Sequence, residues 1–185
     1  MDTFAYSAGN LVGKGGWTDY GLTSLVVQGA GDVAGNGTPD TFGAEHSVLS
    51  AGINVNGPYT VTLVFEFLSA GSGDSTVEVD VNEYTDGYFT SVSLNRAGPG
   101  NSVAVHLSVP SDSAAGTITL ATNTPHTLTL TRTVTDAWAV KINATSVCSV
   151  GLIAIGNAPI ETVGLITATG STNNKARIHS VAISP

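Results

Sequence analysis

Apolar residues alternate with polar ones over much of this chain, and that alternation limits what the chain can fold into. The segment 59–68 (YTVTLVFEFL) places its apolar side chains from Val61 to Phe67 on one side, and 75–82 (STVEVDVN) does the same with three valines. A period of two is typical of strands that bury one face. No comparable helical spacing occurs, so we expect an all-β protein.

Further segments with the same character are separated by turn-forming Gly, Pro, Asn and Asp residues. The additional expected strands are 88–94, 102–109, 116–121, 126–133, 138–142, 150–155, 161–167 and 176–183. About ten short strands without helices between them predict a sandwich or a barrel. The length of 185 residues suits one hydrophobic core. We therefore expect a single domain over 1–185, with a long loop at the Gly-rich stretch 29–40.

Composition excludes several classes of function. Only 6 residues are Lys or Arg against 14 Asp or Glu, and no basic cluster occurs, so nucleic acid is not an expected partner. No apolar stretch approaches the ~20 residues of a membrane span, and the start of the chain lacks the pattern of a signal peptide. We expect synthesis in the cytoplasm without such a signal. The single cysteine, Cys148, allows no internal disulfide and is expected to be buried and inert.

Three parts of the chain resemble the concanavalin A-like (LamG-like) jelly-roll superfamily. They are the opening 2–4 with the Gly-Trp turn 13–17, the paired segments PHTLTLTR (125–132) and WAVKIN (138–143), and the ending 163–165 with 176–183. The resemblance implies an all-β, two-sheet antiparallel jelly-roll sandwich whose closing strand returns beside the first, with Trp17 as a packing residue. It departs at Asn143-Ala144, where the family often has glycine in the turn.

The resemblance settles fold better than function, because the superfamily includes lectins, carbohydrate-binding modules, glycoside hydrolases and domains of phage virions. Glycan binding needs aromatic faces beside hydrogen-bonding groups. The best cluster is an expected hairpin tip carrying Tyr84, Asp86, Tyr88 and Phe89. The alternative is simple cross-strand pairing of these aromatic rings. Trp138 is expected in the core, because Val140 and Ile142 share its face.

A metal site is a further candidate. Asp32, Asn36 and Asp40 share the Gly-rich loop, and oxygen ligands on a loop suit Ca²⁺. Their spacing matches no defined motif, and such residues also serve turns by bonding nearby backbone. The four histidines are scattered and lack the spacing of a zinc site.

The segment 78–83 (EVDVNE) resembles the E-x-D-x-x-E strand of family 16 glycoside hydrolases, in which the first and last Glu are nucleophile and acid/base. A retaining glycosidase needs its two carboxyl groups about 5–5.5 Å apart. On a regular strand Glu78 and Glu83 point to opposite faces, so a bulge would be required. Position 82 is Asn where that family prefers an apolar residue, and aromatic residues are scarce. We therefore expect that Glu78 and Asp80 simply form the polar side of a strand and that the protein is not an enzyme.

The function expected first is a structural or adhesive module that coats a virion surface, as a capsid decoration or a fibre head. Its partners would be a capsid or other protein assembly, a cell-surface glycan, and further copies of the chain through a sheet edge. The alternative is a carbohydrate-binding module of a polysaccharide-targeting system, with calcium assisting. A small hydrolase using Glu78 and Glu83 comes third.

Overall fold

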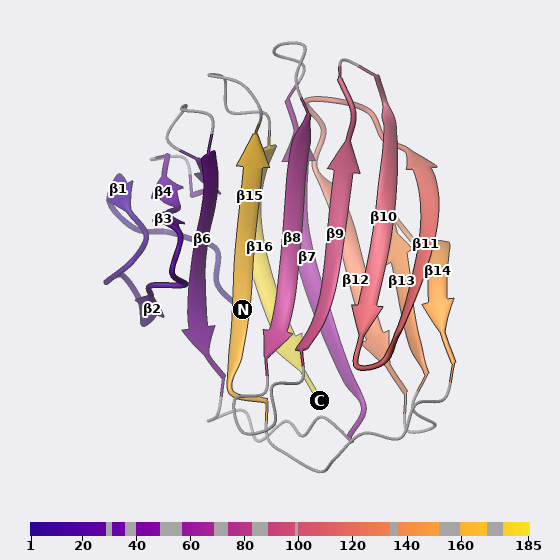
Figure 1. Ribbon diagram of the computed structural model, residues 1–185. Coiled ribbons are helices and arrows are strands. Elements are labelled where there is room, and N and C mark those ends of the chain that lie inside the picture. The colour runs from indigo at the N-terminus through magenta and orange to yellow at the C-terminus, as the bar shows by residue number, and fades with distance from the viewer. Residues whose placement is uncertain are drawn as a thin grey trace.

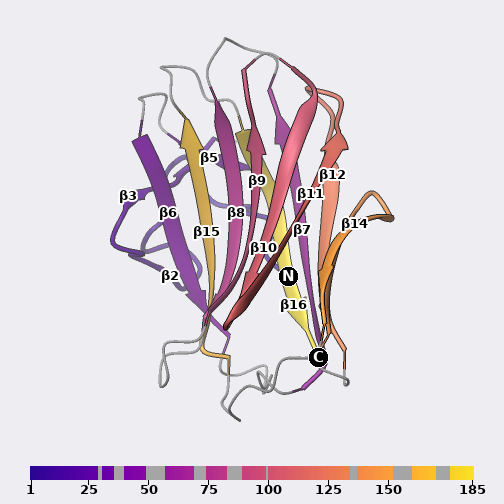
Figure 2. The same cartoon turned by 45° about the vertical axis from the view of Figure 1, so that its right-hand side comes forward.

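The computed structural model describes residues 1–28, 31–35, 40–48, 57–68, 74–82, 89–98, 100–133, 137–151, 160–169 and 176–185. Within these residues the secondary structure consists of strands and turns, and no helix is long and apolar enough to cross a membrane. The strands form two sheets that stack face to face (Figures 1 and 2). We call them the front sheet and the back sheet, as they lie in Figure 1.

The front sheet has the order β11-β10-β9-β8-β15-β6-β2, with the short β3 also paired to β6. All its pairings are antiparallel except β3 with β6, which is parallel. Its strands are β2 (Trp17–Thr18), β3 (Thr23–Ser24), β6 (Asp40–Ser47), β8 (Ser75–Asn82), β9 (Phe89–Arg96), β10 (Ser102–Val109), β11 (Asp112–Thr119) and β15 (Thr162–Thr169).

The back sheet has the order β1-β4-β5-β16-β7-β12-β13-β14 and is antiparallel throughout. Its strands are β1 (Gly9–Asn10), β4 (Val26–Val27), β5 (Val33–Ala34), β7 (Tyr59–Phe67), β12 (His126–Arg132), β13 (Trp138–Ile142), β14 (Thr145–Val150) and β16 (Ala176–Ser184). The expected two-sheet antiparallel architecture is confirmed.

The alternating side chains fill the space between the two sheets. The apolar side of β7, from Val61 to Phe67, is buried, as are the three valines of β8. Trp138 and Trp17 are also buried, at 0% and 1% exposure, which confirms the packing role expected for both. Because neighbouring positions on a strand point to opposite faces, Thr76, Glu78, Asp80 and Asn82 of β8 face away from this core.

Two of the expected strands begin more than two residues away from the strand that the structure shows. The strand expected at 116–121 begins at Asp112, because Pro110 and Ser111 alone make the turn, with Ser111 at a φ of 71°. Of the strand expected at 150–155, Val150 is the last residue of β14, which begins at Thr145, and Gly151 lies outside any strand. Residues 152–155 are not described, so that part stays a prediction.

Two smaller expectations are corrected as well. The stretch 29–40 is not all loop, because it contains β5 and the first residue of β6. Cys148 is only partly buried on β14, although burial raises the pKa of its thiol. The closing strand does return beside the chain start, where Asp2 forms an isolated antiparallel bridge to Val181 of β16.

Candidate functional site

The outward side of the front sheet, which we call the front face, is polar and built from small side chains. Its members occupy the positions that alternate with the buried apolar residues of β8, β9, β10 and β15. The front face comprises Thr76, Glu78, Asp80, Asn82, Ser91, Ser93, Asn95, Ala104, His106, Ser108, Thr162, Gly164, Ile166 and Ala168.

Tyr20 lies across one side of the front face, because two neighbouring strands carry glycine there. A Cβ atom added to Gly164 of β15 would lie 3.1 Å from the Tyr20 ring, and one added to Gly43 of β6 would lie 3.2 Å from it. Any larger residue at either position would displace the ring. The two glycines therefore let a residue from the loop after β2 rest on the sheet.

The Tyr20 hydroxyl is fixed by β8. It donates a 2.5 Å hydrogen bond to Oδ2 of Asp80, and Nδ2 of Asn82 lies 3.4 Å from the same hydroxyl oxygen. Asn82 also reaches the Thr162 hydroxyl on β15 at 3.3 Å. This network covers Asp80, whose exposure is only 4% although it faces away from the core. The expected simple polar side of a strand is therefore a built and partly buried group of side chains.

Glu78 and Asp80 form a pair of carboxyl groups on this face. Burial and the neighbouring Asp80 carboxyl raise the pKa of Glu78 to about 7. Burial also raises the pKa of Asp80, although hydrogen bonds from Tyr20 and Glu78 oppose the shift. The same surroundings raise the pKa of Tyr20, first through burial and then through its bond to Asp80. Tyr20 thus stays a neutral donor.

Strand register arranges small and hydrogen-bonding residues around the carboxyl pair. Ser93 of β9 lies opposite Glu78, and His106 of β10 lies opposite Ser93. In the next row Gly164, Asp80 and Ser91 are opposite one another. Short side chains leave Glu78 approachable, while the surrounding hydroxyl, amide and carboxyl groups offer donors and acceptors. Such a surface suits a ligand rich in hydroxyl groups.

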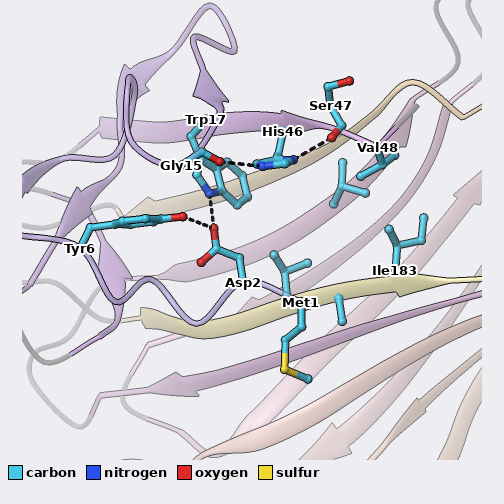
Figure 3. A pocket seen from close by; sticks show the side chains of 12 residues that line it. Met1, Asp2, Tyr6, Gly15, Trp17, His46, Ser47, Val48 and Ile183 are labelled. Carbon is cyan, nitrogen blue, oxygen red and sulfur yellow. Dashed lines mark hydrogen bonds between the residues drawn. The ribbon is translucent and has the colours of Figure 1, made fainter. Parts of the chain in front are cut away.

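A hollow of about 360 Å³ lies near the N-terminus between β6, β15 and β16 (Figure 3). Its polar groups already have partners in the protein. The Asp2 carboxylate accepts bonds from the Trp17 indole at 2.6 Å and the Tyr6 hydroxyl at 2.8 Å. Both ring nitrogens of His46 lie 2.8 Å from backbone carbonyl oxygens, those of Gly15 and Ser47. The hollow therefore joins the chain start to the body, and the front face is the better candidate for a ligand.

The expected aromatic tip falls almost entirely outside the described residues. Tyr84, Asp86 and Tyr88 are not described, and of Phe89 only the backbone is, at the first position of β9 opposite Asn82. Glycan binding by these four residues stays a prediction.

The calcium expectation is tested at one residue only. Asp32 is buried and pairs with Arg177, whose Nε lies 3.3 Å from Oδ2 of Asp32. Asn36 and the side chain of Asp40 lie outside the described residues. The described residues hold no cluster of three His, Cys, Asp or Glu side chains suited to a metal ion. Calcium binding at this loop also stays a prediction.

The hydrolase alternative depends on a bulge in β8. The strand pairs regularly with both neighbours from Ser75 to Asn82, without a register shift. Glu83 follows outside the described residues, so the distance between the two carboxyl groups is not defined.

The sequence did not indicate that Tyr20 and Asp80 belong together. Tyr20 is one of several aromatic residues near the chain start, and Asp80 is one of two acids on a strand. The one signal was the pair of glycines, Gly43 and Gly164, within otherwise regular strands, since such glycines often mark the close approach of another group.

No known family model matches the sequence, and no curated protein matches it either. Solved structures do match. The carbohydrate recognition domain of Emp47p has a TM-score of 0.66 at 11% identity and covers 97% of this chain and 94% of its own. The fold is a concanavalin A-like jelly roll.

Two other jelly rolls of this fold extend the comparison. The carbohydrate-binding module CBM66 from Bacillus subtilis has a TM-score of 0.59 at 9% identity, covering 92% of this chain and 96% of its own. The CBM2 module of the evolved Dit of Lactobacillus casei BL23 phage J-1 has a TM-score of 0.57 at 10% identity. It covers 94% of this chain and 91% of its own. At such low identity the likeness concerns the jelly-roll fold alone.

Proposed function

We propose that this protein is a non-catalytic carbohydrate-binding domain that holds its ligand on the front face. The observation that carries the proposal is the group formed by Tyr20, Asp80 and Asn82 beside Glu78. It combines one aromatic ring with hydrogen-bonding groups on a sheet surface of small residues. Sugars present C–H faces rimmed by hydroxyl groups, which such a surface complements.

The structural comparisons support the same class of function, since they include a carbohydrate recognition domain and carbohydrate-binding modules. A placement on a virion surface, bound to a capsid or other assembly, remains a second proposal. One observation favours it: the similar CBM2 module belongs to a phage protein. The two proposals are compatible, because a virion protein can bind a cell-surface glycan.

The test is binding of the purified chain to an array of oligosaccharides built from mannose, galactose and glucose, with calcium and with a chelator. Ser93→Arg places a long charged side chain in the middle of the front face, next to Glu78 and His106. Thr129→Arg is the matched control, because Thr129 holds the corresponding outward position on β12 of the back sheet.

We expect the wild type and Thr129→Arg to bind the same glycans, and Ser93→Arg to lose at least about tenfold in affinity, because a hot-spot contact is typically worth 2 kcal/mol or more. Absence of binding in both buffers, or equal binding by the two variants, would overturn the proposal. Binding in the calcium buffer that is lost in the chelator buffer would support the expected calcium site at Asp32, Asn36 and Asp40.

A further inference from the structure

The two carboxyl groups of the front face carry an inference that rests on the proposed function and deepens it. Asp80 has two oxygen atoms in different situations. Oδ2 accepts the Tyr20 hydroxyl, whereas Oδ1 is buried and has no donor. The Glu78 carboxyl, two residues along on the same face, lies in hydrogen-bonding contact with Asp80.

Two carboxyl groups in contact attract each other only when one of them carries a proton. Two carboxylates would repel each other, and a buried carboxylate oxygen without a donor costs free energy. A proton on Glu78 gives Oδ1 of Asp80 the donor that it lacks. No Lys or Arg occupies an outward position on the described strands β6, β8, β9, β10 and β15 to supply a positive charge instead.

We propose that Glu78 and Asp80 share one proton and bind a neutral glycan as a single unit, so that glycan binding weakens when this proton is lost to solvent. The shared proton holds the Glu78 carboxyl against the buried Asp80 and leaves an oxygen of Glu78 as an acceptor for a sugar hydroxyl group. The deprotonated pair offers acceptors only and carries two negative charges on one face. A sugar carboxylate finds no Lys or Arg partner at the described outward positions of these strands, so the ligand class is neutral.

The electrostatic surroundings agree with this geometry. Burial, with Asp80 as the second cause, raises the pKa of Glu78 to about 7. Since the raised pKa belongs to a carboxyl, the proton is held below that pH and leaves as the pH rises through it. Among the described side chains, the other titratable groups near the pair are Tyr20 and the exposed His106 across Ser93. Strand register also places the backbone of Glu45 opposite Gly164.

The first measurement follows the carboxyl ¹³C signals of Glu78 and Asp80 in the ligand-free protein between pH 3 and 9. We expect two coupled steps, one acidic and one near neutral pH, with both residues sensing each step. Independent titration of both groups below pH 5 would overturn the shared proton. This measurement needs no ligand, so it shows whether the two carboxyl groups share a proton even if no glycan binds.

The second measurement follows the affinity for the tightest neutral oligosaccharide of the array between pH 5 and 9. We expect the dissociation constant to be level below about pH 6 and to rise by up to about tenfold for each pH unit above the pKa, because one proton is involved. In Glu78→Gln the amide donates permanently to Asp80, so the dissociation constant of this variant should no longer depend on pH between 5 and 9.

Two controls separate this effect from others. His106→Gln removes the exposed histidine and should keep the pH dependence, as should Asp112→Asn, which removes one exposed negative charge at the end of the β10–β11 hairpin. Binding that is level from pH 5 to 9 in the wild type, or a dependence that follows His106, would overturn the proposal. Absence of glycan binding at every pH would instead refute the proposed function.

Discussion

Asn143 and Ala144 form the two-residue turn between β13 and β14, and both have positive φ, at 50° and 66°. Asn tolerates this conformation, and here it also ties the turn to β12, because its Oδ1 accepts the backbone N–H of Thr127 at 3.0 Å. Ala144 makes no such hydrogen bond with its side chain, and the contact of its Cβ with the backbone at positive φ costs about 1–2 kcal/mol. The one departure from the superfamily pattern is thus a site of local strain.

We expect Ala144→Gly to raise the free energy of unfolding by about 0.5–1 kcal/mol, because the strain removed exceeds the entropy that glycine adds to the unfolded chain. The urea midpoint measures this. Ala139→Gly, at an ordinary strand position of the same hairpin, should shift the midpoint the other way. A loss of stability in both variants would contradict the prediction.

At the scale of elements, β11 of the front sheet closes against β14 of the back sheet at one side of the sandwich (Figure 1). Gly116 makes this approach possible. A Cβ atom added there would lie 2.5 Å from the backbone carbonyl oxygen of Val147 on β14. Backbone cannot move aside as a flexible side chain can, so the two strands would have to separate.

We expect Gly116→Ala to destabilise the protein by about 1–3 kcal/mol, the usual range for overpacking. Gly151→Ala is the matched control, because a Cβ there meets no described residue within 4 Å, and its effect should stay within about 0.5 kcal/mol. Thermal unfolding of both variants checks the difference. Equal melting temperatures would show that β11 and β14 are not in close contact.

At the scale of the whole molecule, Asp2 joins the two sheets. Its backbone exchanges hydrogen bonds with Val181 of the back sheet at 2.8 and 3.1 Å. Its side chain accepts the indole N–H of Trp17 from the front sheet. Burial alone would raise the pKa of Asp2, but the hydrogen bonds from Trp17, Phe4 and Tyr6 outweigh it and lower the pKa.

We expect Asp2→Asn to lower the free energy of unfolding at pH 7 by about 1–3 kcal/mol, since it weakens charge-assisted hydrogen bonds. A lowered carboxyl pKa stabilises the fold above the unfolded value of about 4 and loses that effect as the pH falls through the folded value. The difference from wild type should therefore shrink below about pH 4. Asp112→Asn controls for the loss of one charge, and a difference that is the same at pH 3 and pH 7 would contradict the assignment.

The sequence by itself determined most of the longer strands and their buried sides, because alternation over adjacent residues directly records which side is buried. The two-sheet architecture was implied by the resemblance to the jelly-roll superfamily, and β6 was not expected. Strands β8, β10 and β13 have the expected bounds. The expected start of β11 was wrong, because its turn uses only Pro110 and Ser111 where local composition suggested four residues. The strand β14 was not expected over Thr145–Val150. Of the candidate site, the sequence predicted only that Glu78 and Asp80 lie on the polar side of one strand.

Only the tertiary structure decided what those carboxyl groups experience. Tyr20 covers Asp80 from sixty positions earlier in the sequence. It can do so only because the pairing of β6 with β15 places Gly43 and Gly164 at diagonal positions beneath the same ring. Burial and hydrogen bonding depend on such distant contacts. The protonation of the pair is therefore set by the assembled sheet and not by the residues next to it in the chain.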